Sequence, residues 1–87
     1  MELTYHLKSE VLRTKVNLLI YKPDIVKALK SFPMVKLLNI TPTELTIFVG
    51  AGDDKLNGIV RQLFRTIART SNLGKYYNKG LFRRKEI

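Results

Sequence analysis

Few residues in this chain of 87 have a type and spacing that could carry chemistry. The chain has no cysteine and one histidine, His6, and no histidine and carboxylate residues stand at the spacing of metal ligands. Asp53 and Asp54 are adjacent carboxylates that could hold a magnesium ion, but two acids at a predicted helix start far more often cap the helix. We therefore expect no metal site and no cofactor.

The stretch GAGDDK, residues 50–55, lies between a predicted strand and a predicted helix, where phosphate-binding loops occur. It lacks the spacing and the Lys-Ser/Thr ending of a nucleotide-binding loop, and its two carboxylates would repel a phosphate. No nucleophile has a base at a recognisable spacing. The sequence therefore predicts that the protein is not an enzyme on its own.

Positive charge is concentrated in the C-terminal part of the chain. Residues 1–54 carry seven basic and six acidic residues, and residues 55–87 carry nine basic and one acidic, which gives net charges of +1 and +8. This asymmetry favours a polyanion or an acidic protein as partner, although basic composition can also serve solubility alone. The lack of cysteine, of a long apolar run and of a signal-peptide core predicts a cytoplasmic protein with no membrane partner.

Three arginines, Arg61, Arg65 and Arg69, recur at every fourth position of the segment GDDKLNGIVRQLFRTIART, residues 52–70. On a helix this spacing places them on one face, and Gly58 falls on the same face, opposite the apolar residues. A glycine inside a helix costs about 0.8–1 kcal/mol relative to alanine. Either the glycine lets another backbone come close to this face, or it reflects drift at a tolerant surface position.

Hydrophobic periodicity predicts the elements that position these residues. The expected elements are a strand over 13–21, a helix from Lys22 that Pro33 ends, strands over 35–40 and 44–49, and a long helix that Asp53 or Asp54 caps and Asn72 and Gly74 stop. Residues 2–8 also alternate and indicate either a further strand or an extension of the first one. Residues 1–74 are expected to form one domain, and residues 75–87 a basic, aromatic tail.

The predicted fold is α+β with the order β-α-β-β-α, a three-stranded antiparallel sheet with its third strand in the middle, and two helices on one face of the sheet. Since two helices cover only one face, the other face would show Leu19, Phe48 and either Leu38 or Ile40. Exposed apolar residues on a small sheet predict a dimer or a protein partner, although scattered surface hydrophobic residues are also common.

The segment TELTIFVGAGDDKLNGIVRQLFRTIART, residues 43–70, resembles the C-terminal half of the small dimerisation subunit of the KEOPS tRNA-modification complex. In that family a strand and a short connector with an aspartate precede a helix that starts Leu-Arg-Gly and continues with Asn-Ser and then an arginine. Here Leu56, Gly58 and Arg65 match, and Val60 fits the apolar position. The predicted length and order of elements agree as well.

This chain departs from the family pattern at three places. Asn57 stands where the family has arginine, the pair Arg61-Gln62 replaces Asn-Ser, and the connector is one residue shorter. The chain is therefore more similar to a divergent second copy of the subunit, such as some archaea carry, than to the standard one.

The resemblance implies a non-catalytic scaffold subunit of a complex that forms threonylcarbamoyladenosine on tRNA. The family sheet pairs with another copy of the subunit, identical or paralogous, and its helices pack on the catalytic ATPase-like subunit. In a heterodimer with the standard subunit, only one side would bind a catalytic subunit. The implied partner-binding residues are Leu56, Asn57, Gly58, Arg61 and Arg65, and the implied dimer interface contains Leu19 and Phe48.

The C-terminal part supplies the expected contacts to tRNA, at Arg69, Lys75, Lys79, Arg83, Arg84 and Lys85. The alternative function is a stand-alone small basic nucleic-acid-binding domain in which Tyr76, Tyr77 and Phe82 stack on bases. However, the strands show neither a clear aromatic platform nor the GxxG loop of common RNA-binding modules. A third reading, an amphipathic helix on a membrane surface, explains the apolar residues of the last helix less well than a protein core does.

Overall fold

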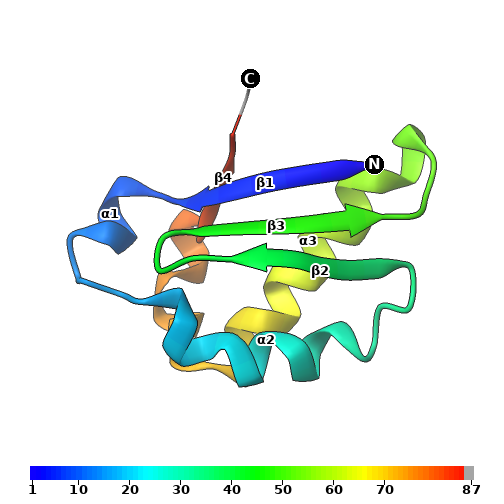
Figure 1. Cartoon of the computed structure of the whole chain (residues 1–87). Helices are drawn as coiled ribbons and strands as arrows, with labels where there is room; N and C mark the ends of the chain where they lie inside the picture. Colours follow the sequence, from blue (N-terminus) through cyan, green and yellow to red (C-terminus); the bar gives the residue numbers. More distant parts are fainter. Residues whose placement is uncertain (86–87) are drawn as a thin grey trace.

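The computed structural model describes residues 1–85, without the side chains of residues 53 and 76–79. It has an α+β fold with a four-stranded antiparallel sheet in the order β2-β3-β1-β4 (Figure 1). The elements are β1 (Glu2–Leu7), α1 (Ser9–Leu12), the 3-10 helix η1 (Leu18–Tyr21), α2 (Lys22–Leu29), β2 (Val35–Ile40), β3 (Glu44–Val49), α3 (Asp53–Thr70), the 3-10 helix η2 (Asn72–Lys79) and β4 (Phe82–Arg84). The order of strands and main helices, β-α-β-β-α-β, is that of ferredoxin-like folds.

The predicted three-stranded sheet with two helices is wrong, and one reason is the segment 13–21. The first strand of the sheet is β1, and the segment 13–21 forms a turn followed by η1. The side chain of Asn17 accepts a hydrogen bond from the Leu19 N–H at 2.9 Å and caps η1. Leu18 is buried there, but Ile20, expected on the same face, is 72% exposed. Local capping therefore outweighs the apparent alternation.

The second reason is β4, which lies in the part of the chain expected to be a tail. This strand pairs antiparallel with β1 and brings Phe82 opposite Leu7. Phe82 is only 8% exposed, so the segment after η2 belongs to the packed structure. A strand of three residues with two arginines is too short to show an alternating pattern in the sequence.

Other elements match their predictions. β2 and β3 have the predicted bounds, and β3 lies between β1 and β2, antiparallel to both. The helix α2 begins at Lys22 as predicted but ends at Leu29, four residues before Pro33. The N-cap of α3 is Gly52 and neither of the aspartates that follow it.

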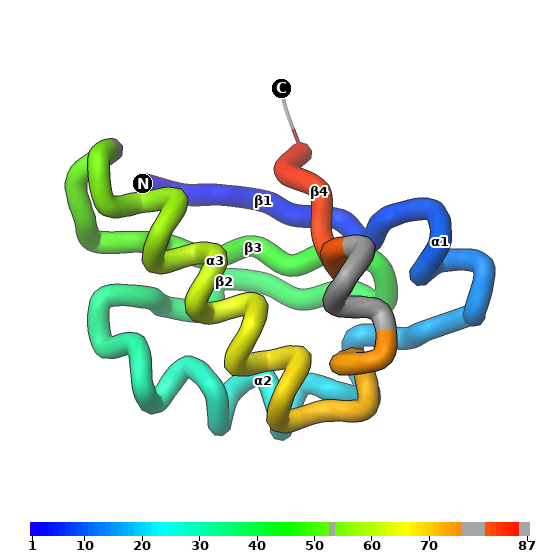
Figure 2. The backbone as a smooth tube through the Cα atoms, turned by 180° about the vertical axis from the view of Figure 1, so that it is seen from behind, coloured from blue at the N-terminus to red at the C-terminus, as the bar shows by residue number. Residues whose placement is uncertain are grey.

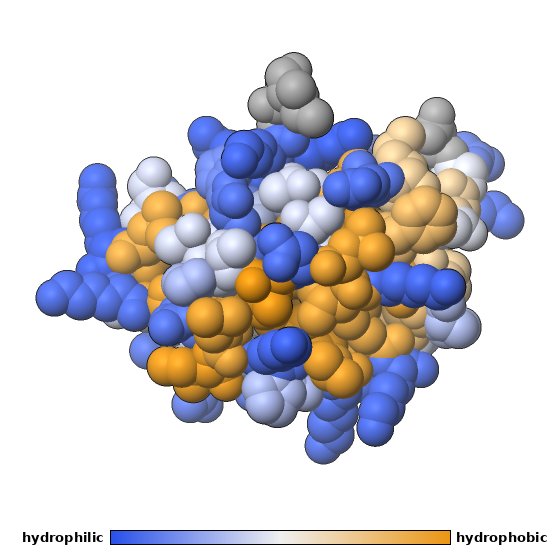
Figure 3. Space-filling model, in the orientation of Figure 1, coloured by the Kyte–Doolittle hydropathy of each residue, from blue (hydrophilic) through white to orange (hydrophobic). Residues whose placement is uncertain are grey.

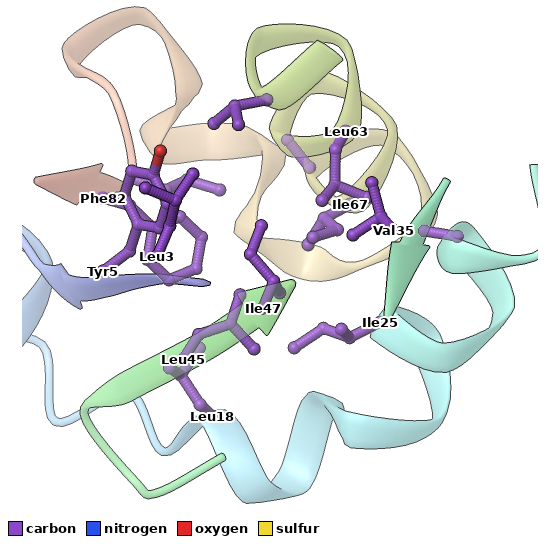
Figure 4. Close-up of a cluster of buried hydrophobic side chains, with 14 of the residues drawn as sticks. Leu3, Tyr5, Leu18, Ile25, Val35, Leu45, Ile47, Leu63, Ile67 and Phe82 are labelled. Carbon is purple, nitrogen blue, oxygen red and sulfur yellow. The ribbon is translucent and has the colours of Figure 1, made fainter. Parts of the chain in front are cut away.

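One face of the sheet is covered by the helices and the other is open. Figures 1 and 2 show α3 crossing one side of the sheet, with α2 beside it along the β2 edge. Alternate residues of the strands point toward α3 and form the core with the apolar side of that helix. Figure 4 shows Leu45 and Ile47 of β3 together with Leu63 and Ile67 of α3. The ring of Phe64 lies between the rings of Tyr5 and Phe82, with centroids 4.8 and 4.6 Å away.

Candidate partner and nucleic-acid interfaces

The outer face of α3 is the first candidate surface. Asn57, Gly58, Arg61 and Arg65 are all exposed there, on the side turned away from the sheet. Leu56 is 5% exposed and lies in the core, so it supports this face from beneath and does not form part of it. A Cβ atom added to Gly58 would have no neighbouring atom within 4 Å, so the fold itself does not require glycine at this position.

The outer face of α3 belongs to a long stretch of sequence whose charged residues are all basic. From Lys55 to Lys85 the sequence contains nine basic residues and no acidic one. On α3 itself, Arg61, Arg65 and Arg69 are exposed, and a spacing of four residues corresponds to a rise of about 6 Å along the helix axis. This face can therefore attract a carboxylate-rich protein surface or a phosphate backbone.

The two residues predicted for the dimer interface do not share a surface. Phe48 is 42% exposed on the open face of the sheet, near the end of β3. Leu19 lies in η1, whose residue Leu18 donates a backbone hydrogen bond to Pro42, just before the other end of β3. Ile40 pairs with the buried Leu45 and faces the core side. The structure therefore does not bring Leu19 and Phe48 together.

Exposed apolar residues instead gather along one edge of the molecule. Leu19, Ile20, Val26 and Leu38 are exposed on η1, α2 and the edge strand β2, whose register with β3 shifts between Leu37 and Asn39. Figure 3 shows hydrophobic groups toward this edge and hydrophilic groups toward β1 and β4. Such a shift in an edge strand disturbs the regular ladder that another strand would need for pairing.

The residues predicted to contact nucleic acid fall into two groups. Arg69 lies in the last turn of α3 and Lys75 in η2, whereas Arg83, Arg84 and Lys85 lie in or next to β4 at the sheet edge. The side chains of Lys79, Tyr76 and Tyr77 lie outside the described part. Phe82, predicted to stack on bases, is instead buried in the core.

Two of the basic residues at the β4 edge have defined neighbours. The Lys85 Nζ atom lies 3.1 Å from the Glu44 Oε2 atom and forms an exposed ion pair across β1. Burial raises the pKa of the Tyr5 phenol above its ordinary value of 10.0, and the charge of Arg84 offsets part of this rise. The β4 edge thus carries three cations, one of which is paired with a carboxylate.

Neither a metal centre nor a membrane span is found in the described residues. No group of three His, Asp or Glu residues among them could hold a metal ion. None of their helices combines the length and the apolar character needed to cross a bilayer.

Comparison of the chain with models of known protein families, with curated proteins and with solved structures gives no match. The resemblance to the KEOPS small subunit therefore rests on the pattern within residues 43–70 alone. The observed fold also differs from the expected β-α-β-β-α order by the additional strand β4.

Proposed function

We propose that this protein is a non-catalytic scaffold subunit of a KEOPS-like tRNA-modification complex, active in the cytoplasm, and that it binds a protein partner through the outer face of α3. The observation that supports the proposal is the position of the pattern that carries the resemblance. Asn57, Gly58, Arg61 and Arg65 lie together on an exposed helical face, and among the described residues no atom of another segment lies within 4 Å of where a Cβ atom on Gly58 would stand.

A glycine at this position suits helix packing for a physical reason. The distance between two packed helices depends on the side chains at their contact, and is about 8–10 Å between axes. Gly58 contributes no side chain, so a partner helix can come close to the α3 backbone at that point. Arg61 and Arg65, one and two turns further along, can then form charge-assisted hydrogen bonds with acidic groups of the partner.

The variant Gly58→Leu tests this proposal. Leucine is a better helix former than glycine, so the variant should fold at least as stably as the wild type. Its affinity for the catalytic subunit of such a complex, measured by sedimentation and calorimetric titration, should fall by at least tenfold because the added side chain holds the partner away. Asn39→Leu adds a similar side chain on the opposite side of the molecule, and this control should leave the affinity unchanged.

Two results would contradict the proposal. One is unchanged partner affinity of Gly58→Leu, which would show that the outer face of α3 is not the contact surface. The other is a wild-type protein that stays monomeric and binds none of the subunits, which would remove the scaffold role altogether.

A second candidate function is a small basic nucleic-acid-binding domain that acts alone. The run of basic residues from Lys55 to Lys85, without a single acid, favours it. Binding of the isolated protein to generic RNA or DNA, in the absence of any protein partner, would support this second function over the first.

A further inference from the structure

The open face of the sheet is formed by side chains from all four strands. They alternate along the strands with the buried residues that face α3, and Figure 1 shows α3 on one side of the sheet only. This open face consists of Glu2, Thr4 and His6 from β1, Lys36 and Asn39 from β2, Glu44, Thr46 and Phe48 from β3, Arg83 from β4, and Lys85 directly after it.

Two threonine hydroxyl groups occupy the centre of this face, and two rings lie toward its opposite ends. The hydroxyl oxygens of Thr4 and Thr46 lie 3.1 Å apart on the two central strands. His6 stands between Glu44 and Arg83 in the register, and Phe48, opposite Glu2 at the other end of the ladder, is a large apolar side chain with 42% of its surface exposed. The face therefore offers two hydroxyl groups at its centre and one ring toward each end, with the exposed Leu38 of β2 next to Asn39.

Cations flank this centre on both edges. Lys36 lies on β2, directly beside Phe48, and Arg83 lies on β4 at the opposite edge. Three strand spacings separate the two edges, a width of about 14 Å. Arg84 and Lys85 add two further cations at the β4 edge, against the carboxylates of Glu2 and Glu44 on the face.

This arrangement favours a nucleic acid over a second copy of the chain. A stable dimer buries about 800 Å² per partner, with an apolar centre, and the centre of this face is polar. Single-stranded nucleic acids are bound by aromatic rings that stack on bases, with basic side chains nearby that contact phosphates. Phe48 beside Lys36, and His6 beside Arg83, each combine a ring with a cation on neighbouring strands.

We propose that the open face binds single-stranded nucleic acid, with a base stacked on Phe48 and phosphates held by Lys36 and Arg83. The Lys85–Glu44 ion pair lies on the same face and orients the Lys85 amine across β1. The proposal does not depend on the scaffold role, because it concerns the side of the sheet opposite to α3.

The test measures the affinity of the full chain for fluorescein-labelled ten-nucleotide oligo-U and oligo-dT by fluorescence anisotropy between 50 and 200 mM salt. Phe48→Ala should weaken binding by about 5- to 140-fold, the range found for one stacked base. Phe48→Leu retains apolar size without a ring and should weaken binding as well. Arg83→Ala should lower the slope of log affinity against log salt by about 0.7, the share of one phosphate contact. The two oligonucleotides distinguish RNA from DNA as the preferred ligand.

Arg61→Ala is the matched control, because it removes the same charge from the opposite side of the molecule. It should change affinity by less than twofold at 200 mM salt, where charges further apart than about 10 Å are screened. Urea midpoints establish that each variant folds. If Phe48→Ala does not fold, Phe48→Leu alone tests the role of the ring.

Three outcomes would overturn the proposal. The first is wild-type oligonucleotide affinity in both Phe48 variants. The second is a loss of affinity in Arg61→Ala equal to that in Arg83→Ala, which would place the oligonucleotide on α3. The third is no oligonucleotide binding together with a dimer that Phe48→Ala dissociates, which would assign the face to a second copy of the chain. Since α3 is unchanged in the Phe48 and Arg83 variants, loss of oligonucleotide binding with normal protein-partner binding would leave the scaffold proposal intact.

Discussion

Replacing Phe82 by alanine tests whether the C-terminal segment is part of the folded structure. In the fold described above, β4 pairs with β1 and places Phe82 in the core against Phe64. A mobile tail would instead leave the Phe82 ring in water, and its removal would change stability by no more than about 0.5 kcal/mol. The two cases differ enough to be separated by one measurement.

The expected loss follows from burial and ring contact. Burying a phenylalanine side chain contributes about 1.5–3 kcal/mol, and Phe82 is 8% exposed, so most of this range applies. The ring lies 4.6 Å from that of Phe64, and such an aromatic pair adds about 0.5–1.5 kcal/mol. We therefore expect Phe82→Ala to lower the free energy of unfolding by about 3 kcal/mol, in line with the roughly 3–5 kcal/mol of buried Phe→Ala changes.

Urea unfolding followed by circular dichroism measures this loss. With a slope of about 1.5 kcal/mol per molar urea, the midpoint should fall by about 2 M. Arg84→Ala, two residues further along the same strand and exposed, is the control and should shift the midpoint only slightly. A shift of less than about 0.3 M in Phe82→Ala would refute the packing of β4 against the core.

Two further predictions concern stability. Gly58→Ala should stabilise the protein by up to about 1 kcal/mol, because the site is an exposed helix interior with free space around it. Gly74→Ala should destabilise it by about 1–3 kcal/mol, because the new Cβ atom would lie 2.7 Å from the carbonyl oxygen of Ala68. Urea midpoints that shift in opposite directions would confirm the pair, and equal shifts would contradict it. A Tyr5 pKa raised by burial means that the stability it contributes is fully present below pH 10.0 and is lost as the pH rises through the folded-state pKa. The wild type should therefore lose stability more steeply than Tyr5→Phe above pH 10.0 in thermal melts, and parallel curves would show that the phenol is not desolvated.

The sequence was sufficient for elements whose own pattern is long or regular. In α3 the buried residues Leu56, Val60, Leu63 and Ile67 follow the helical repeat over three turns, so tertiary context could not change the assignment. In β3 every second residue is buried, which is the pattern of a strand with one covered face.

The sequence was misleading where a short pattern is compatible with two kinds of secondary structure. Leu18 and Ile20 alternate like strand residues, but the Asn17 side chain and a contact to Pro42 fix a helical turn instead. The choice depends on contacts with residues distant in the sequence, such as Pro42, and a short sequence window does not contain them. The same holds for Phe82, whose partner Leu7 lies at the other end of the chain.

The candidate surfaces were predictable to different degrees for the same reason. The face that joins Gly58 to Arg61 and Arg65 lies within one helix, so the helical repeat alone reveals it. The open face of the sheet joins His6 to Arg83 and Phe48 to Lys36 through strand pairing. No spacing within the sequence indicates such neighbours, because the rings proposed to stack on bases come singly from separate strands.

The position of the core relates the two proposed surfaces to each other. The apolar side of α3 packs on the inner face of the sheet, so the outer face of α3 and the open face of the sheet point in opposite directions (Figures 1 and 2). A protein partner seated over Gly58 would therefore leave Phe48 and Arg83 accessible, and a nucleic acid on the sheet would leave Gly58 accessible. If both proposals hold, a ternary complex should form without competition, because neither ligand needs the surface of the other.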